Sequence, residues 1–106
     1  MAESALVRQI LDHLAEFFPD HCETLRPAAL RAHVEQAIAQ ARSHGLTEGP
    51  HLCLFVDLVF LFGHDFDSQP WAAGILRDPE LAAKREVQAI CLKEAARELL
   101  AEQRRT

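Results

Sequence analysis

An almost uninterrupted apolar run at residues 52–62 constrains this chain more than any other feature. Asp57 is the only charged residue among these eleven positions, and the run is too short for a membrane span, which needs about 20 residues. A segment that is apolar on nearly every face must be buried in a water-soluble domain. Its length and the Gly63 that follows it favour a helix over a buried strand. We therefore predict a central helix that begins after an N-cap at Thr47 and ends at Phe62.

Two helices are predicted before the central one. Apolar residues that recur every three or four positions indicate a first helix from an N-cap at Ser4 to Phe18. The same spacing indicates a second helix that opens at Pro27 and is ended by Gly45. The polar segment 20–26 between them is predicted to be a connecting turn.

Two further helices are predicted after the central one. A short helix opens at Pro70, with Asp67 or Ser68 as its cap, and a longer one runs from a cap at Asp78 towards Gln103. The sequence contains no internal repeat and no linker-like stretch. We expect an all-α fold in which residues 1–106 form one domain: a bundle of about five helices, one of them short, around the central apolar helix.

The charge balance and the cysteines narrow the class of protein. Eleven Lys and Arg face sixteen Asp and Glu, which gives a net charge of −5 and argues against binding to nucleic acid. Cys22, Cys53 and Cys91 are odd in number and lack a C-x-x-C spacing, so a disulfide framework is not expected. No secretory signal or membrane segment is apparent in the sequence. We expect a cytoplasmic protein in a reducing compartment.

Candidate chemistry is sparse. No nucleophile elbow, P-loop or dinucleotide-binding motif is present, so we expect no enzyme and no cofactor. Asp65 and Asp67 have the spacing of a cation loop, but a calcium loop needs a Glu at the twelfth position, where Leu76 stands. The neighbours 21–23, a His-Cys-Glu run, point in different directions, so we expect no metal. A small metal-dependent enzyme centred on His64, Asp65 and Asp67 is the remaining alternative.

The histidines and Asp57 each allow two interpretations. His13 and the other histidines scattered over the predicted helices are expected to be surface or capping residues, although a proton-sensitive interface is the alternative. Asp57 either marks a narrow wet face of the central helix, which we favour, or is a buried carboxylate with a partner.

The loop after the central helix is the predicted partner-binding surface, and its candidate residues are Asp65, Phe66, Asp67 and Trp71. It mixes aromatic side chains with carboxylates, as protein interfaces often do. The alternative is structural: Phe66 and Trp71 would close the core while Asp67 caps the next helix.

The same loop carries a resemblance to a known group of proteins. The most specific words are Gly63-His64-Asp65-Phe66-Asp67, Pro70-Trp71-Ala72 and Ile75-Leu76, with weaker matches such as Phe18-Pro19 and Pro27-Ala28-Ala29-Leu30-Arg31. In these words the chain resembles small helical proteins of proteobacteria that are encoded near type VI secretion spike, PAAR-type and effector genes. The resemblance implies an adaptor or chaperone that binds an effector or spike component. An immunity protein that blocks a toxin is the alternative, and self-association stays open.

Overall fold

The computed structural model describes residues 2–105, and its secondary structure in this range is entirely helical, which confirms the all-α class. None of the helices described combines the length and apolar character that crossing a bilayer requires. The elements in chain order are α1 (Ala2–Phe17), α2 (Pro19–Thr24), α3 (Pro27–Ser43), α4 (Gly49–Phe62), the short 3-10 helix η1 (Phe66–Ser68), α5 (Pro70–Arg77), α6 (Pro79–Ala83) and α7 (Arg85–Arg105).

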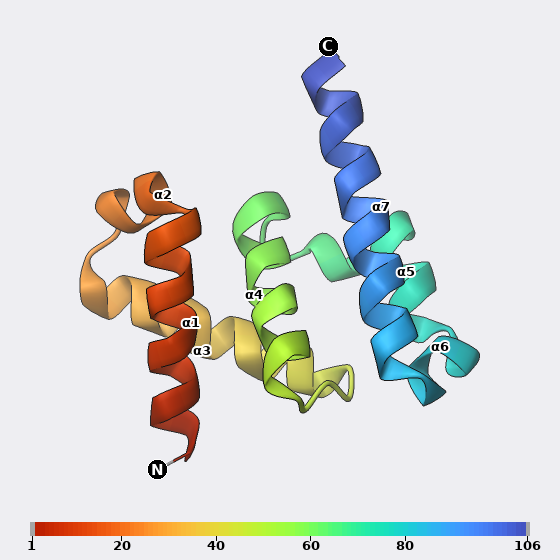
Figure 1. Cartoon of the computed structure of the whole chain (residues 1–106), viewed down its shortest axis with the longest axis horizontal. Helices are drawn as coiled ribbons and strands as arrows, with labels where there is room; N and C mark the ends of the chain where they lie inside the picture. The colour runs from red at the N-terminus through yellow and green to blue at the C-terminus, as the bar shows by residue number, and fades with distance from the viewer. Residues whose placement is uncertain (1, 106) are drawn as a thin grey trace.

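The predicted central helix is α4. It lies between α1 and α7, and α3 passes across the far side of α1 and α4 (Figure 1). Helices α5 and α6 pack against α7 (Figure 1). One face of α4 is closed to solvent, and removing such large apolar side chains from water contributes about 1.5–3 kcal/mol each. Its buried apolar residues are Leu52, Phe55, Val56, Leu58 and Val59.

Glycine and proline set several helix ends as predicted. Gly45 follows α3 with φ +86° and Gly63 follows α4 with φ +98°, a left-handed backbone that favours glycine. Pro27 and Pro70 open α3 and α5. The Asp78 side chain accepts hydrogen bonds from the first backbone N–H groups of α6, as the predicted cap should.

Other boundaries were predicted wrongly. The first helix begins at Ala2 rather than after Ser4, whose side chain lies outside the described residues. Residues 19–24, where a connecting turn was predicted, form the short helix α2. Its six residues are mostly polar and show no helical spacing of apolar side chains. The cap of α4 is Glu48 and not Thr47, and it makes no side-chain capping bond.

The predicted last helix is broken in two at Lys84, between α6 and α7. Gln88 is fully buried just after the break. Its side-chain amide donates to the carbonyls of Ile75 and Leu76, and its oxygen accepts from Arg85. These bonds satisfy backbone carbonyls in the last turn of α5 that have no partner within the helix. The break at Lys84 therefore orients α7 against α5.

Candidate functional site

Three polar side chains, two on α3 and one at its C-cap, hold the predicted partner-binding loop. His33, Gln40 and His44 are spaced by seven and four residues and therefore share one face of α3. His33 Nδ1 lies 3.0 Å from His64 Nε2, and Gln40 donates to the His64 carbonyl at 2.5 Å. His44 Nε2 donates to Asp67 Oδ2 at 2.8 Å. The loop after α4 is thus fixed to α3 at three points.

The aromatic residues of this loop belong to the core. Phe66 is fully buried, with its ring centroid 4.8 Å from that of Phe55. Trp71 is half-buried and meets Phe62 edge to face at 5.2 Å, while its indole N–H donates to Gln69. Phe66 in this conformation is closed to any partner.

The two carboxylates of the loop differ in environment. Asp65 is exposed, whereas Asp67 is half-buried beneath His44. The predicted capping role of Asp67 or Ser68 is wrong, because the N-cap of α5 is Gln69 and the Asp67 carboxylate is occupied by α3. Burial raises the pKa of Asp67, but hydrogen bonds from His44 and Gln40 and the charge of His44 outweigh it, so the pKa lies below 3.8.

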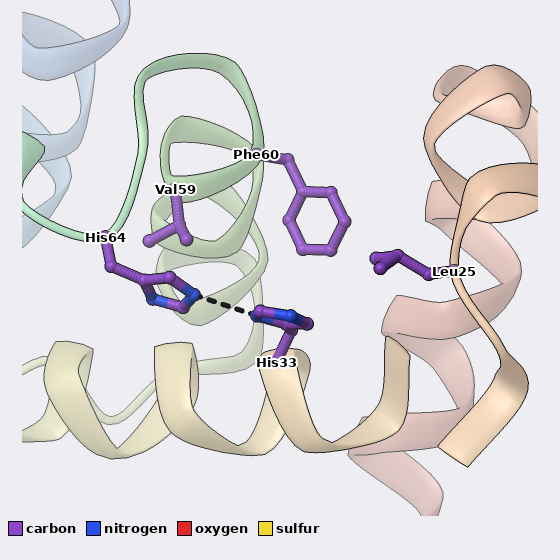
Figure 2. Close-up of a pocket in the computed structure, with 5 residues that line it drawn as sticks. All are labelled: Leu25, His33, Val59, Phe60 and His64. Carbon is purple, nitrogen blue, oxygen red and sulfur yellow. Dashed lines mark hydrogen bonds between the residues drawn. The ribbon is translucent and has the colours of Figure 1, made fainter. Parts of the chain in front are cut away.

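A mostly apolar cavity of about 180 Å³ lies beside the two stacked histidines. Leu25, His33, Val59, Phe60 and His64 line it, and the His33–His64 hydrogen bond crosses one side of it (Figure 2). The other ring nitrogen of His64, Nδ1, is buried without a hydrogen-bond partner. His64 is therefore held through Nε2 alone, by its hydrogen bond with His33.

The structure does not bring His64, Asp65 and Asp67 together as metal ligands. Among the described residues, the one cluster of three such side chains with converging ligand atoms lies elsewhere: His13, Cys53 and Asp57. The side chain of His21 lies outside the described residues, so the run at 21–23 is described only for Cys22 and Glu23.

Asp57 combines the two interpretations: it is a half-buried carboxylate with a partner, and it also lines a groove on the outward face of α4. Its two oxygens lie 3.0 and 2.9 Å from Nε2 of His13, a residue of α1 that is 44 positions away in sequence. The ring of His13 in turn packs against Phe17, with centroids 4.7 Å apart. The pair connects α1 to the outward face of α4.

A groove runs along this face of α4 between α1 and α7. Two adjoining cavities of about 370 and 240 Å³ form it and share Pro50 and Cys53. Side chains of α1 line one end and side chains of α7 line the other. The remaining lining residues are Leu6, Gln9, Ile10, Gly49, His51, Leu54, Asp57, Ala89, Ile90 and Lys93.

Large apolar side chains stand exposed around the groove. Phe17, which packs against His13 on α1, is 62% exposed, and Ile90, which lines the groove from α7, is 59% exposed. Leu61 is 40% exposed and lies one helical turn beyond Asp57 on α4. The groove therefore has an exposed apolar side chain on its α7 bank and the carboxylate of the His13–Asp57 pair on its floor.

The surroundings of Asp57 and Cys53 at the floor of the groove disfavour the ionised form of each side chain. Burial raises the pKa of Asp57 above 3.8, and the hydrogen bond and charge of His13 only partly offset it. Burial and the nearby Asp57 carboxylate raise the pKa of Cys53 to about 11. The thiol is therefore protonated at neutral pH and is not activated as a nucleophile. The spacing of Cys53 and Asp57 is visible in the sequence, but nothing there marks His13 as their neighbour.

Comparison with known proteins adds no relative. No protein-family model matches the chain, and neither a curated protein nor a solved structure matches it. The structure itself defines an all-α helical domain with a groove along its central helix.

Proposed function

We propose that this chain is a protein-binding accessory domain, an adaptor or chaperone that holds a segment of a type VI secretion effector or spike component in the groove between α1 and α7. The observation that carries the proposal is the groove itself, where Ile90 exposes most of its apolar surface on the α7 side, together with the exposed Phe17 that packs against His13 on α1. Exposed apolar patches rimmed by polar residues mark interaction sites on soluble proteins.

The geometry favours an amphipathic helix as the occupant. A groove bounded by two helices and floored by a third accepts a helix whose apolar residues recur every three or four positions. The chain carries a net charge of −5, so the polar face of the occupant is expected to be basic. The type VI partner class is supported by the resemblance in the loop at residues 63–76.

An immunity protein that blocks a toxin is the second candidate. The acidic charge of the chain favours it, because a toxin that acts on nucleic acid presents a basic surface that an acidic inhibitor can cover. The identity of the captured protein separates the two candidates.

The test is capture of partners from the native host by the tagged full-length chain, with identification by mass spectrometry. We expect a type VI effector or spike component with the unaltered chain, and at least a tenfold loss of it with Phe17→Asp or Ile90→Asp. Ala39→Asp, at an exposed position of α3 away from the groove, is the matched control and should retain the partner. Capture that survives both groove substitutions would place the interface elsewhere, with the loop residues Asp65 and Trp71 as the next candidates.

A further inference from the structure

We propose that His13, Cys53 and Asp57 form a zinc-binding site with three protein ligands on the floor of the groove. Their ligand atoms, an imidazole nitrogen, a sulfur and a carboxylate oxygen, all lie within 4.8 Å of one another. This site is independent of the proposed partner, because it rests on these three side chains alone. It departs from the sequence analysis, which looked for ligands only among neighbours in the chain.

The helices place the ligands from two directions. Cys53 and Asp57 are four residues apart on α4, so their side chains leave the same face one turn apart. His13 approaches from α1, with Nε2 already directed at the carboxylate of Asp57 at 2.9 Å. Two ligands at this helical spacing and a third from another element are a recurrent way to build a zinc site.

The distances require only a small adjustment. Zinc bonds of about 2.0–2.3 Å in a tetrahedral arrangement separate the ligand atoms by about 3.3–3.8 Å. Donors that lie within 4.8 Å of one another therefore need to close by about 1 Å, while His13 and Asp57 open slightly to admit the ion. All three side chains are only partly buried, which leaves them room to turn.

The donor set selects zinc rather than calcium or magnesium. Zinc would displace the proton of the Cys53 thiol to solvent, and the resulting thiolate and the imidazole suit zinc, whereas the two hard cations take oxygen ligands. Asp57 and Cys53 both line the groove, so the fourth position of the ion would face the groove. A water molecule, or a side chain of the segment that occupies the groove, would complete the coordination.

The same contacts have a simpler interpretation, in which His13 and Asp57 are only a hydrogen-bonded pair and Cys53 is an unreactive thiol beside it. The two interpretations differ in what Cys53 contributes. A hydrogen-bonded pair does not need the sulfur, whereas a zinc site loses a ligand when it is replaced.

The experiment is a titration of the full-length chain, freed of metal by a chelator, with zinc ion alone. We expect one zinc per chain with a dissociation constant of micromolar or tighter, and a thiolate-to-metal charge-transfer band when cobalt replaces zinc. Cys53→Ser should abolish the band and weaken zinc binding more than 100-fold, since loss of even an outer-shell partner weakens a metal site about 10–100-fold. Cys22→Ser, which alters a half-buried cysteine on α2, should leave both unchanged.

His13→Gln provides a second variant in case Cys53→Ser disturbs the packing of α4, and circular dichroism verifies the fold of each. Absence of stoichiometric binding at tens of micromolar zinc would overturn the proposal. Binding that both Cys53→Ser and His13→Gln retain at full strength would also overturn it, because the ion would then sit elsewhere. Partner capture by metal-free protein is scored separately, so the two proposals can fail independently.

Discussion

Two histidine–aspartate pairs lie on opposite sides of α4, and their carboxylates are shifted in opposite directions. The pKa of Asp67, paired with His44, is lowered, whereas the pKa of Asp57, paired with His13, is raised. Burial raises both. Asp67 overcomes it with hydrogen bonds from His44, Gln40 and its own backbone, while Asp57 has only the hydrogen bond and charge of His13 against it.

This difference separates the α3 side of the molecule, which stabilises the fold, from the groove side, which is the candidate for binding. On the α3 side, three side chains hydrogen-bond the loop at His64 and Asp67 and its aromatic ring fills the core, while one ring nitrogen of His64, Nδ1, is buried without a partner. On the groove side, a carboxylate, an imidazole and a thiol lie together at a surface that no other element covers completely. Side chains fixed by packing in the core stabilise a fold, and titratable side chains gathered at a groove are candidates for binding.

The largest effect on stability is expected from a substitution on the α3 side of the molecule. Phe66→Ala should lower the free energy of unfolding by about 3–5 kcal/mol, the usual cost of emptying a buried aromatic site. Ile90→Ala, on the groove side, should change it by less than about 0.5 kcal/mol, because Ile90 is largely exposed. Urea denaturation followed by circular dichroism measures both. Similar costs for the two variants would contradict the contrast.

Trp71→Ala is expected to come next. The indole is half-buried against Phe62 and Phe66, so its loss should cost about 2–3 kcal/mol, less than the loss of the fully buried Phe66. Partner capture should persist at a temperature at which the variant is folded. A variant that kept its stability and lost the partner would instead make this loop the interface that the sequence analysis placed there.

Much of the fold was predictable, because helix ends are encoded locally. Gly45, Gly63 and Pro70 mark ends within a few residues, and the apolar run identifies the central helix. Helix α2 was missed because six mostly polar residues carry no periodicity, and the break at Lys84 was missed because Asp78 already provided a convincing start.

The candidate site was less predictable than the fold. Cys53 and Asp57 share a helix face, which their spacing predicts, but His13 joins them only through the packing of α1 on α4. The loop was ambiguous for a different reason: carboxylates and aromatic residues look alike in sequence whether they face a partner or α3. The three side chains that hold the loop lie 23 to 31 positions away from the residues they contact.

The dependence of stability on acidic pH tests the His44–Asp67 pair. Because the pKa of Asp67 is lower in the folded chain than in the unfolded one, its contribution to stability is present above about pH 4 and is lost as the pH falls through the folded value. Asp67→Asn should cost about 1–2 kcal/mol at pH 7 and should flatten the fall in stability below about pH 4. Thermal melts across this range measure it. A variant with the same pH profile as the unaltered chain would show that Asp67 does not contribute to acid sensitivity.

The smallest effect is expected from the matched substitution in the other pair, Asp57→Asn in chelator-treated protein. Burial makes the ionised Asp57 less favourable in the folded chain than in water, so removing the charge removes an unfavourable contribution at pH 7. The amide oxygen still accepts a hydrogen bond from His13. These effects offset one another, and we expect a change in the free energy of unfolding of less than about 1 kcal/mol, of either sign. Side-by-side denaturation of Asp57→Asn and Asp67→Asn tests the comparison directly. If Asp57→Asn proves the more costly of the two, the His13–Asp57 pair stabilises the fold as the His44–Asp67 pair does. The proposed contrast between a structural pair and a ligand-binding pair would then be wrong.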